Sequence, residues 1–494
     1  MKQYLLGIDV GTTGTKAMLF SADGEVCGHA YRPYDLVSSR VNYNEQNAED
    51  WWNAIVETVK EICSEKDIAE NVAAISLSLQ GGTVVPVDEN MKPLRLAMVW
   101  NDRRCTEEHE EFLKEVGSVS DMYEKSGWML GNGLPLLHLR WIKKHEPEIF
   151  AKAKMFLTVP DYVSYKMTGL TQVDMSNAGI NQFTDIRNGK YDEKLLEFAG
   201  ITEDQLPKIV HSGDVIGNLT EKAAKELGLT TKCVLVAGAH DQYAVMLGAG
   251  AVNKGDILIG SGTCWVVVAT SDKPNFETGL SQSVAAIPGM WGSLKSLSSG
   301  GVCLEWLRKY IALGEEEKAI SLKDIDARVD QVEAAKDKLF FYPFAGKSSK
   351  TANFQKGTFT GLDLSHDRFH MARAIMEGVV FQVHWIMDAF VNEKNVGEIK
   401  LTGGASKSRV WAQMVADIFG IPVRIPEVAD MACVGAAIIA GTGCGIFESA
   451  EAGYKAFAVK EKILYPDAER VKMYAPLIKE YRRGAEILGN IYNL

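Results

Sequence analysis

The sequence predicts an α/β protein built from two large domains. Short runs rich in β-branched residues alternate with amphipathic helical patterns along the chain, which is typical of the α/β class. The chain has 494 residues, more than one ordinary hydrophobic core accommodates. An apolar run, a Gly/Thr turn and a second apolar run near the N-terminus recur near the middle of the chain, which indicates two domains that begin alike. We predict domains at 1–245 and 246–494.

The composition excludes several classes of protein. Hydrophobic residues make up 46% and charged residues 24%, values that are typical of folded globular proteins. A net charge of -11 disfavours nucleic acid as a partner. The 8 cysteines include no CxxC pair, so we expect reduced thiols and a cytoplasmic location. Asp9 interrupts the N-terminal apolar stretch, and the run 433–447 is too short to cross a bilayer, so we expect neither a signal peptide nor a membrane segment.

The segment 7–20 is predicted to be a hairpin of two antiparallel strands joined by a tight turn. Asp9 ends the first strand, where a carboxylate can hold a metal-bound water. Glycines in the turn let backbone N–H groups face an anion, and threonine hydroxyls and a lysine add donors and charge. No helix begins there, so the turn is not a Walker A motif. The candidates for phosphate binding are Gly11, Thr12, Thr13 and Lys16, and the alternative is a hairpin without function.

The other elements follow in order from periodicity and capping residues. Apolar residues at helical spacing predict a helix from Asp50 to Cys63, with Asn47 as N-cap. A longer helix is predicted over 367–391, capped by Ser365. The run 433–447 consists of small residues and is predicted to be a helix packed against a flat surface. Strands are predicted at 73–79, 233–237, 256–259, 265–269 and 398–402.

Asp241 is the candidate catalytic residue. It follows the strand at 233–237 and a small-residue turn, and it opens a helix that runs to Gly248. A carboxylate at this position can face a ligand and stay ionised. We interpret it as a general base that takes the proton of a substrate hydroxyl during phosphoryl transfer. The alternative is that Asp241 only caps the helix.

Several motifs, in order along the chain, resemble those of the FGGY family of carbohydrate kinases, which belongs to the clan of actin-like ATPases. The resemblance covers nearly the whole chain. It rests on the segments Glu45–Asn47 with Trp51-Trp52, Val99–Arg104, Asp161-Tyr162, Met167–Gly169, Asp174–Ala178, Gly238–Gln242 and Leu401–Ser408.

The resemblance implies two RNase H-like domains with an interdomain cleft, which is expected to close on binding. Sugar is expected on the N-terminal side of the cleft, and ATP with Mg²⁺ on the C-terminal side. Asp9 and Asp241 are then the carboxylates near the metal. The hairpin around Gly262 and Thr263 is expected to clamp the phosphates. Gly301, Glu305, Gly404 and Ser408 are expected to border the nucleoside.

The sugar itself is less well defined by the sequence. The loop after the strand at 73–79 carries Gln80 and Gly81, where xylulokinase-like members carry Met-His-Gly and glycerol kinases carry Arg-Glu. Gln242 resembles the Asp-Gln pair of glycerol kinases, whereas the missing Arg-Glu pair counts against glycerol. The residues expected to bind substrate are Gln80, Gly81, Asn101, Asp102, Asp241 and Gln242, although Asn101, Asp102 and Gln80 equally fit loop or capping roles.

The leading interpretation is therefore an ATP-dependent kinase of a pentulose such as xylulose. Ribulose, glycerol or another polyol, a sugar acid and a signalling sugar stay open as substrates. A non-catalytic actin-like nucleotide-binding module is the alternative from another class, and Asp241 argues against it because such a module needs no base. The sequence does not determine the oligomeric state, and a homodimer is among the states that stay open.

Overall fold

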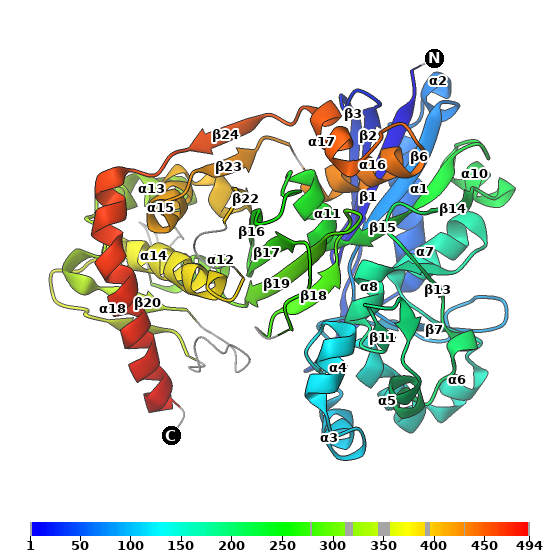
Figure 1. Cartoon of the computed structure of the whole chain (residues 1–494), viewed down its shortest axis with the longest axis horizontal. Helices are drawn as coiled ribbons and strands as arrows, with labels where there is room; N and C mark the ends of the chain where they lie inside the picture. The colour runs from blue at the N-terminus through cyan, green and yellow to red at the C-terminus, as the bar shows by residue number, and fades with distance from the viewer. Residues whose placement is uncertain are drawn as a thin grey trace. The chain divides into compact units, whose positions relative to one another are not determined.

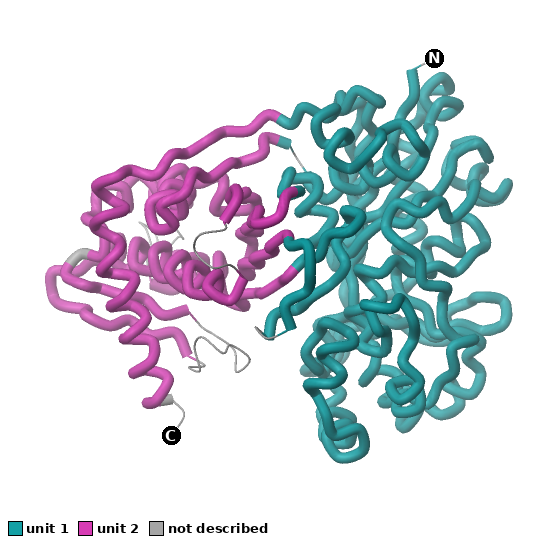
Figure 2. The backbone as a smooth tube through the Cα atoms, in the orientation of Figure 1, with its two compact units in different colours: residues 1–252, 271–292, 428–459 teal, residues 253–270, 293–427, 460–494 magenta. Residues whose placement is uncertain are grey.

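The computed structural model describes residues 2–276, 279–311, 320–343, 356–390, 396–428 and 430–492. They form two compact units, each discontinuous in sequence. Unit 1 comprises residues 1–252, 271–292 and 428–459, and unit 2 comprises 253–270, 293–427 and 460–494 (Figure 2). The boundary between sequence domains at residue 245 stays a prediction.

Unit 1 is built on a mixed six-stranded sheet with the order β14-β15-β6-β1-β2-β3 (Figure 1). β1 pairs antiparallel with β2 and parallel with β6, so the predicted N-terminal hairpin is confirmed. The strands are β1 (Tyr4–Val10), β2 (Gly14–Ser21), β3 (Val26–Pro33), β6 (Val72–Leu79), β14 (Val215–Asn218) and β15 (Val234–His240).

The two faces of this sheet are covered in different ways because side chains alternate along a strand. Leu6, Ile8 and Val10 belong to a buried apolar cluster with α1 (Ala48–Ile62), whose N-cap Asn47 accepts from the N–H of Glu49 as predicted. Other helices contribute side chains to the same cluster, namely α7 (Val159–Thr168) and α10 (Glu221–Leu227). The residues between them in sequence, Leu5, Gly7 and Asp9, therefore belong to the opposite face.

On that opposite face, α16 (Met431–Gly443) lies directly against the backbone of the sheet. A Cβ atom on Gly7 would come within 1.9 Å of the carbonyl oxygen of Cys433, so a larger residue there would push the helix away. Gly435 has the same role toward α11 (Asp241–Gly248), where its Cβ would lie 1.9 Å from the carbonyl oxygen of Ala244. The predicted small-residue helix on a flat surface is thereby confirmed, although it spans Met431–Gly443 and not 433–447, and it contacts both β1 and α11.

Unit 1 also contains a second core away from the six-stranded sheet. Phe112, Leu137, Phe156 and Phe198 are among its buried members. Its helices are α3 (Thr106–Glu115), α4 (Val119–Ser126), α5 (Pro135–His145) and α9 (Glu193–Ala199).

Unit 2 repeats the central pattern of unit 1. β16 pairs antiparallel with β17 and parallel with β22, as β1 does with β2 and β6. The paired order is β19-β17-β16-β22-β23-β24. These strands are β16 (Ile257–Ser261), β17 (Trp265–Ser271), β19 (Trp291–Leu297), β22 (Ile399–Gly403), β23 (Val423–Pro426) and β24 (Glu461–Leu464). The internal duplication and the α/β class are thus confirmed.

Long helices supply much of the core of unit 2. They are α12 (Gly301–Tyr310), α13 (Leu322–Val329), α14 (Arg368–Met387), α15 (Arg409–Phe419) and α18 (Ala468–Tyr492). The predicted N-cap of α14 was wrong: Asp367, not Ser365, accepts from the N–H groups of Phe369 and His370. Ser365 instead donates to Asp363 in the preceding turn. The helix ends at Met387, and the predicted end at residue 391 lies outside the described residues. Nowhere in the described ranges does a helix reach the length and apolarity needed to cross a membrane.

His138 on α5 makes the stability of unit 1 depend on pH. Its side chain is fully buried, and burial lowers its pKa from 6.5 to about 4. Between these two values the unfolded chain binds a proton that the folded chain does not, so stability falls as the pH falls. We expect a loss of about 2 kcal/mol between pH 7.5 and pH 5 from this residue. Denaturant unfolding of His138→Leu should show a flatter pH profile, whereas His29→Leu, at an exposed position, should keep the wild-type slope. Equal slopes in all three proteins would contradict this assignment.

Candidate active site

Asp9 lies near the end of β1 and is almost completely buried. Its Oδ1 accepts a hydrogen bond from the Ser78 hydroxyl at 2.7 Å, and its Oδ2 lies 3.4 Å from the Lys16 ammonium. Burial, followed by repulsion from Asp430, raises the pKa of Asp9 to about 6, although Lys16 and Ser78 act in the opposite direction. Asp241 adds to the repulsion, so the two predicted metal-site carboxylates interact within unit 1.

Asp430 completes this group and was missed by the sequence interpretation. It is the N-cap of α16, and its Oδ1 accepts from the N–H groups of Ala432 and Cys433 at 3.0 and 3.1 Å. Its Oδ2 lies 2.7 Å from the Lys16 ammonium, so Lys16 bridges two carboxylates. An aspartate directly before a helical run is an ordinary capping signal, and this signal could have been recognised. A contact of Lys16 with phosphate stays a prediction.

The chemistry of this group fits a hard divalent cation. Asp430 and Asp241 are carboxylates that both repel Asp9, and the contacts described for the three include one ammonium, that of Lys16. Mg²⁺ prefers oxygen ligands and keeps several waters, which one or two carboxylates can hold. A cation would relieve the repulsion that raises the pKa of Asp9.

The turn between β1 and β2 is held through its carbonyl groups. The hydroxyl of Tyr34 donates to the carbonyl of Gly11 at 2.5 Å, the amide of Gln46 to that of Thr12 at 2.5 Å, and the hydroxyl of Tyr31 to that of Thr13 at 3.2 Å. The indole N–H of Trp100 donates to the Thr12 hydroxyl at 3.0 Å. Three consecutive peptide groups therefore have fixed orientations, which is what a preorganised anion-binding turn requires.

Gln80 and Gly81 follow β6 and lie next to the end of β1. The backbone N–H of Gln80 donates to the carbonyl of Val10 at 3.0 Å. Its side chain is buried, and its amide donates to Gln46 Oε1 at 2.8 Å. Position 81 requires glycine, because a Cβ there would lie 2.5 Å from the ring of His240. This contact brings the predicted sugar loop against the residue that precedes Asp241.

Asp241 is the first residue of α11, directly after β15. His240 occupies the N-cap position, so the geometry does not support the alternative that Asp241 caps the helix. The Asp241 side chain is 34% exposed, and its Oδ1 lies 3.3 Å from His240 Nδ1. Within the described part of the chain, its carboxylate accepts no hydrogen bond. Gln242, the next residue, is also partly exposed. A partly exposed carboxylate that accepts no hydrogen bond from the described residues is available to a substrate.

Two further residues around His240 were missed. The Ser176 hydroxyl accepts from the backbone N–H of His240 at 2.8 Å and donates to the carboxylate of Asp174, which links the start of α11 to a buried acid. The indole ring of Trp128 lies 5.9 Å from the His240 ring. The indole N–H of Trp128 is buried and has no hydrogen-bond partner among the described residues. The contact between Ser176 and Asp174 is local, whereas the contacts of Ser176 and Trp128 with His240 join distant segments and leave no local sequence signal.

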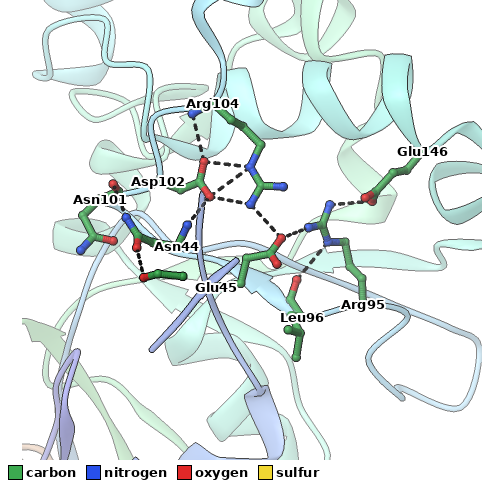
Figure 3. Close-up of polar contacts among 9 residues, drawn as sticks. Asn44, Glu45, Arg95, Leu96, Asn101, Asp102, Arg104 and Glu146 are labelled. Atoms are coloured by element: carbon green, nitrogen blue, oxygen red, sulfur yellow. Dashed lines mark hydrogen bonds and ion pairs between the residues drawn. The ribbon is translucent and has the colours of Figure 1, made fainter. Parts of the chain in front are cut away.

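The side-chain hydrogen bonds described for Asn101 and Asp102 are with Asn44 and with Arg104. Asp102 is fully buried, and its carboxylate accepts from the Arg104 guanidinium at 2.6 Å and from the backbone N–H of Asn44 at 2.8 Å (Figure 3). Arg104 also pairs with Glu45 at 2.8 Å. This geometry favours the loop role of Asp102 over a sugar contact. The Asn101 carbonyl accepts from the Asn44 amide, whereas its Oδ1 is buried without a partner in the described part of the chain.

Unit 2 contains a cavity of about 510 Å³ between β16, α12, α13 and α15. Apolar walls come from Leu304, Ala405 and Trp411. Asp326, also at its lining, accepts from the Ser408 hydroxyl at 2.8 Å. All six residues predicted to bind nucleotide in this half of the chain line the cavity, namely Gly262, Thr263, Gly301, Glu305, Gly404 and Ser408. A partly apolar cavity with glycine edges and a few polar groups suits a purine nucleoside.

Comparisons with known proteins agree with the resemblance. The model for the FGGY family of carbohydrate kinases, N-terminal domain, matches residues 4–248, and that for the C-terminal domain matches residues 256–444. The chain is 32% identical over 462 residues to the gluconokinase of Bacillus subtilis (strain 168), with 92% of this chain and 90% of that protein covered. It is 30% identical over 486 residues to the xylulose kinase of the same organism, with 97% and 96% covered.

Solved structures show the same fold over the whole chain. The xylulose kinase from Rhodospirillum rubrum superposes with a TM-score of 0.91 at 27% identity, covering 100% of both chains. Plasmodium falciparum glycerol kinase with ADP reaches a TM-score of 0.86 at 19% identity, with 98% of each chain covered, and this likeness concerns the fold alone. The actin-like architecture expected from the sequence is thereby confirmed.

Proposed function

Since the chain belongs to the FGGY family of carbohydrate kinases, we propose that it transfers the γ-phosphate of ATP to a hydroxyl of a pentulose such as xylulose, with Asp241 as the general base. The observation that carries this proposal is the carboxylate of Asp241, which is partly exposed and lies next to the buried Asp9 and the Gln80 loop. The direct test is sugar-dependent release of ADP.

The roles of the residues follow from the needs of phosphoryl transfer, which are alignment and compensation of charge. Asp241 accepts the proton of the attacking hydroxyl. The turn at 11–14 and the hairpin with Gly262 and Thr263 bind phosphate oxygens through backbone N–H and hydroxyl groups. Asp9, with Asp241 and Asp430, holds Mg²⁺ or its waters. When bound, Mg²⁺ neutralises the charge that develops on the phosphate oxygens.

The substrate is proposed on two grounds. Gln80 departs from the histidine that xylulokinase-like members carry at this position, but its amide can hydrogen-bond a sugar hydroxyl. In addition, a relative 30% identical is named xylulose kinase. The contacts described for Gln80, Gly81 and Asp241 involve Gln46, Ile180 and His240, and no lysine or arginine takes part in them. Such surroundings suit a neutral ketose better than an anion.

A sugar acid is the second candidate, because a relative 32% identical is named gluconokinase. A carboxylate on the substrate would need a cationic or strongly donating partner. His240 could supply it in its protonated form, since its ring adjoins both Gly81 and Asp241. A comparison of D-xylulose with D-gluconate as phosphate acceptors separates these candidates.

The nucleoside cavity gives a test that does not depend on the sugar. In Gly301→Ala the new Cβ would lie 2.6 Å from the carbonyl oxygen of Gly262, so the hairpin at Gly262 and Thr263 must shift. Overpacking of this kind should weaken ADP binding about tenfold, as measured by calorimetry. Gly260→Ala is the matched control, because its Cβ on the same hairpin would meet Val266 at an ordinary 3.7 Å. Equal ADP affinities of the two variants would count against this cavity as the nucleoside site.

A further inference from the structure

Gln46 is a buried amide at the end of β5 (Tyr43–Gln46) that connects two loops of unit 1. Its Nε2 donates to the carbonyl of Thr12 at 2.5 Å in the turn between β1 and β2. Its Oε1 accepts from the indole N–H of Trp51 at 3.1 Å and from the amide of Gln80 at 2.8 Å. Since an indole N–H can only donate and a carbonyl can only accept, these neighbours fix which end of the Gln46 amide faces which way.

The fixed orientation of Gln46 determines that of Gln80. With Gln46 Oε1 facing it, Gln80 must present its NH₂ group, because the reverse orientation would bring two acceptor oxygens together. Gln80 Oε1 is then buried and has no hydrogen-bond partner among the described residues. A buried carbonyl oxygen without a partner is unfavourable unless a ligand or water donates to it. One N–H of the Gln80 amide is thus used inside the protein, and Oε1 is left as an acceptor without a donor among the described residues.

We propose that Gln46 is a positioning residue that fixes Gln80 Oε1 as the unpaired acceptor of this loop, so that the sugar must offer a hydroxyl donor to that oxygen. The inference rests on the proposed function only in taking Gln80 as part of the sugar site. It adds a polarity to that site: an analogue whose hydroxyl is replaced by hydrogen or fluorine leaves Gln80 Oε1 unpaired and is rejected. Glutamine alone at position 80 would not discriminate in this way, because a free amide rotates to suit either partner.

A matched pair of tryptophans separates this role from simple burial. Trp51 and Trp52 are neighbours on α1, and both are buried. The indole N–H of Trp52 donates to Glu226 at 2.8 Å, outside the Gln46 contacts, whereas that of Trp51 holds Gln46. Replacement by phenylalanine removes one indole N–H and the same side-chain volume at both positions. Trp51→Phe should therefore weaken the hold on Gln46 and Gln80, which then depends on the Thr12 carbonyl alone, and Trp52→Phe should not.

The first measurement needs no sugar. In protein labelled with ¹⁵N-glutamine, the side-chain NH₂ signals of Gln80, identified by their loss in Gln80→Leu, should exchange slowly with water. Gln46→Met and Trp51→Phe should shift these signals and speed their exchange about tenfold or more, whereas Trp52→Phe should leave them unchanged. If the Gln80 signals are the same in Gln46→Met and in the wild type, Gln46 does not orient Gln80 and the inference is wrong.

The second measurement is selectivity. For each variant we compare, as a ratio, kcat/KM for D-xylulose with kcat/KM for each of its monodeoxy analogues. If only D-gluconate is phosphorylated, D-gluconate and its analogues take their place. The wild type should reject one analogue by about tenfold or more, and in Gln46→Met and Trp51→Phe this ratio should fall toward 1. A merely structural role would lower kcat/KM for all sugars alike, and an unchanged ratio would overturn the inference. If the wild type phosphorylates neither sugar, the proposed pentulose or gluconate activity fails, and the NMR measurement still decides the role of Gln46.

Discussion

Asp241→Asn is expected to lower sugar-dependent turnover by about 10²–10⁴-fold, because asparagine keeps the size of the side chain but cannot accept the proton of the attacking hydroxyl. The fold should be little affected. His240, not Asp241, is the N-cap of α11, and the Asp241 carboxylate accepts no hydrogen bond within the described part of the chain. Turnover is measured as ADP release with saturating sugar, and folding is measured by thermal unfolding.

Glu221→Gln is the matched control for this experiment. Glu221 is also the first residue of a helix, α10, and it is exposed, so its replacement removes the same favourable interaction with the helix dipole. It should leave turnover unchanged. An Asp241→Asn protein that unfolds at the wild-type temperature and still phosphorylates sugar at nearly the wild-type rate would exclude Asp241 as the base.

Removal of divalent metal is expected to abolish turnover, and added Mg²⁺ is expected to restore it. Asp430 and Asp241 both repel Asp9, and the ammonium of Lys16 contacts Asp9 and Asp430 but not Asp241 among the described contacts. The phosphates of ATP would add further negative charge. Full turnover in excess chelator would contradict the metal role.

Asp9→Asn tests which carboxylate of this group serves the metal. The Mg²⁺ concentration that supports half-maximal turnover should rise about 10–100-fold, as for other residues that orient metal ligands or their waters. The affinity for ADP measured without metal is the control and should change little. If the Mg²⁺ requirement of Asp9→Asn equals that of the wild type, Asp9 has no part in metal binding.

The sequence was sufficient to predict the framework because local patterns determine it. Alternating apolar residues and Gly/Thr turns identified both hairpins, and their antiparallel pairing is confirmed. The small residues of α16 predicted a helix in close contact with a flat surface, and Gly7 and Gly435 provide that contact. The N-cap Ser365 was wrong because Asp367 offers the stronger acceptor two residues later.

The details of the site depend on contacts between distant segments, which a single sequence does not reveal. Lys16 was predicted to bind phosphate as a free cation, but Asp430, the N-cap of α16, lies 2.7 Å from its ammonium. Asp102 looked available for sugar, but Arg104 and the backbone of Asn44 occupy its carboxylate. By contrast, the six residues expected to bind nucleotide in this half of the chain line one cavity, because the turn after β16, the helix α12 and the turn before α15 carry them.

The central claim is that the chain phosphorylates a small sugar, and ADP release across a panel of ketoses, polyols and sugar acids tests it most directly. With ATP and Mg²⁺, the account predicts ADP release that depends on one sugar of the panel, D-xylulose first, with one phosphorylated sugar formed per ADP. Release of ADP at the same rate without any sugar, or no release with any member of the panel, would contradict the account.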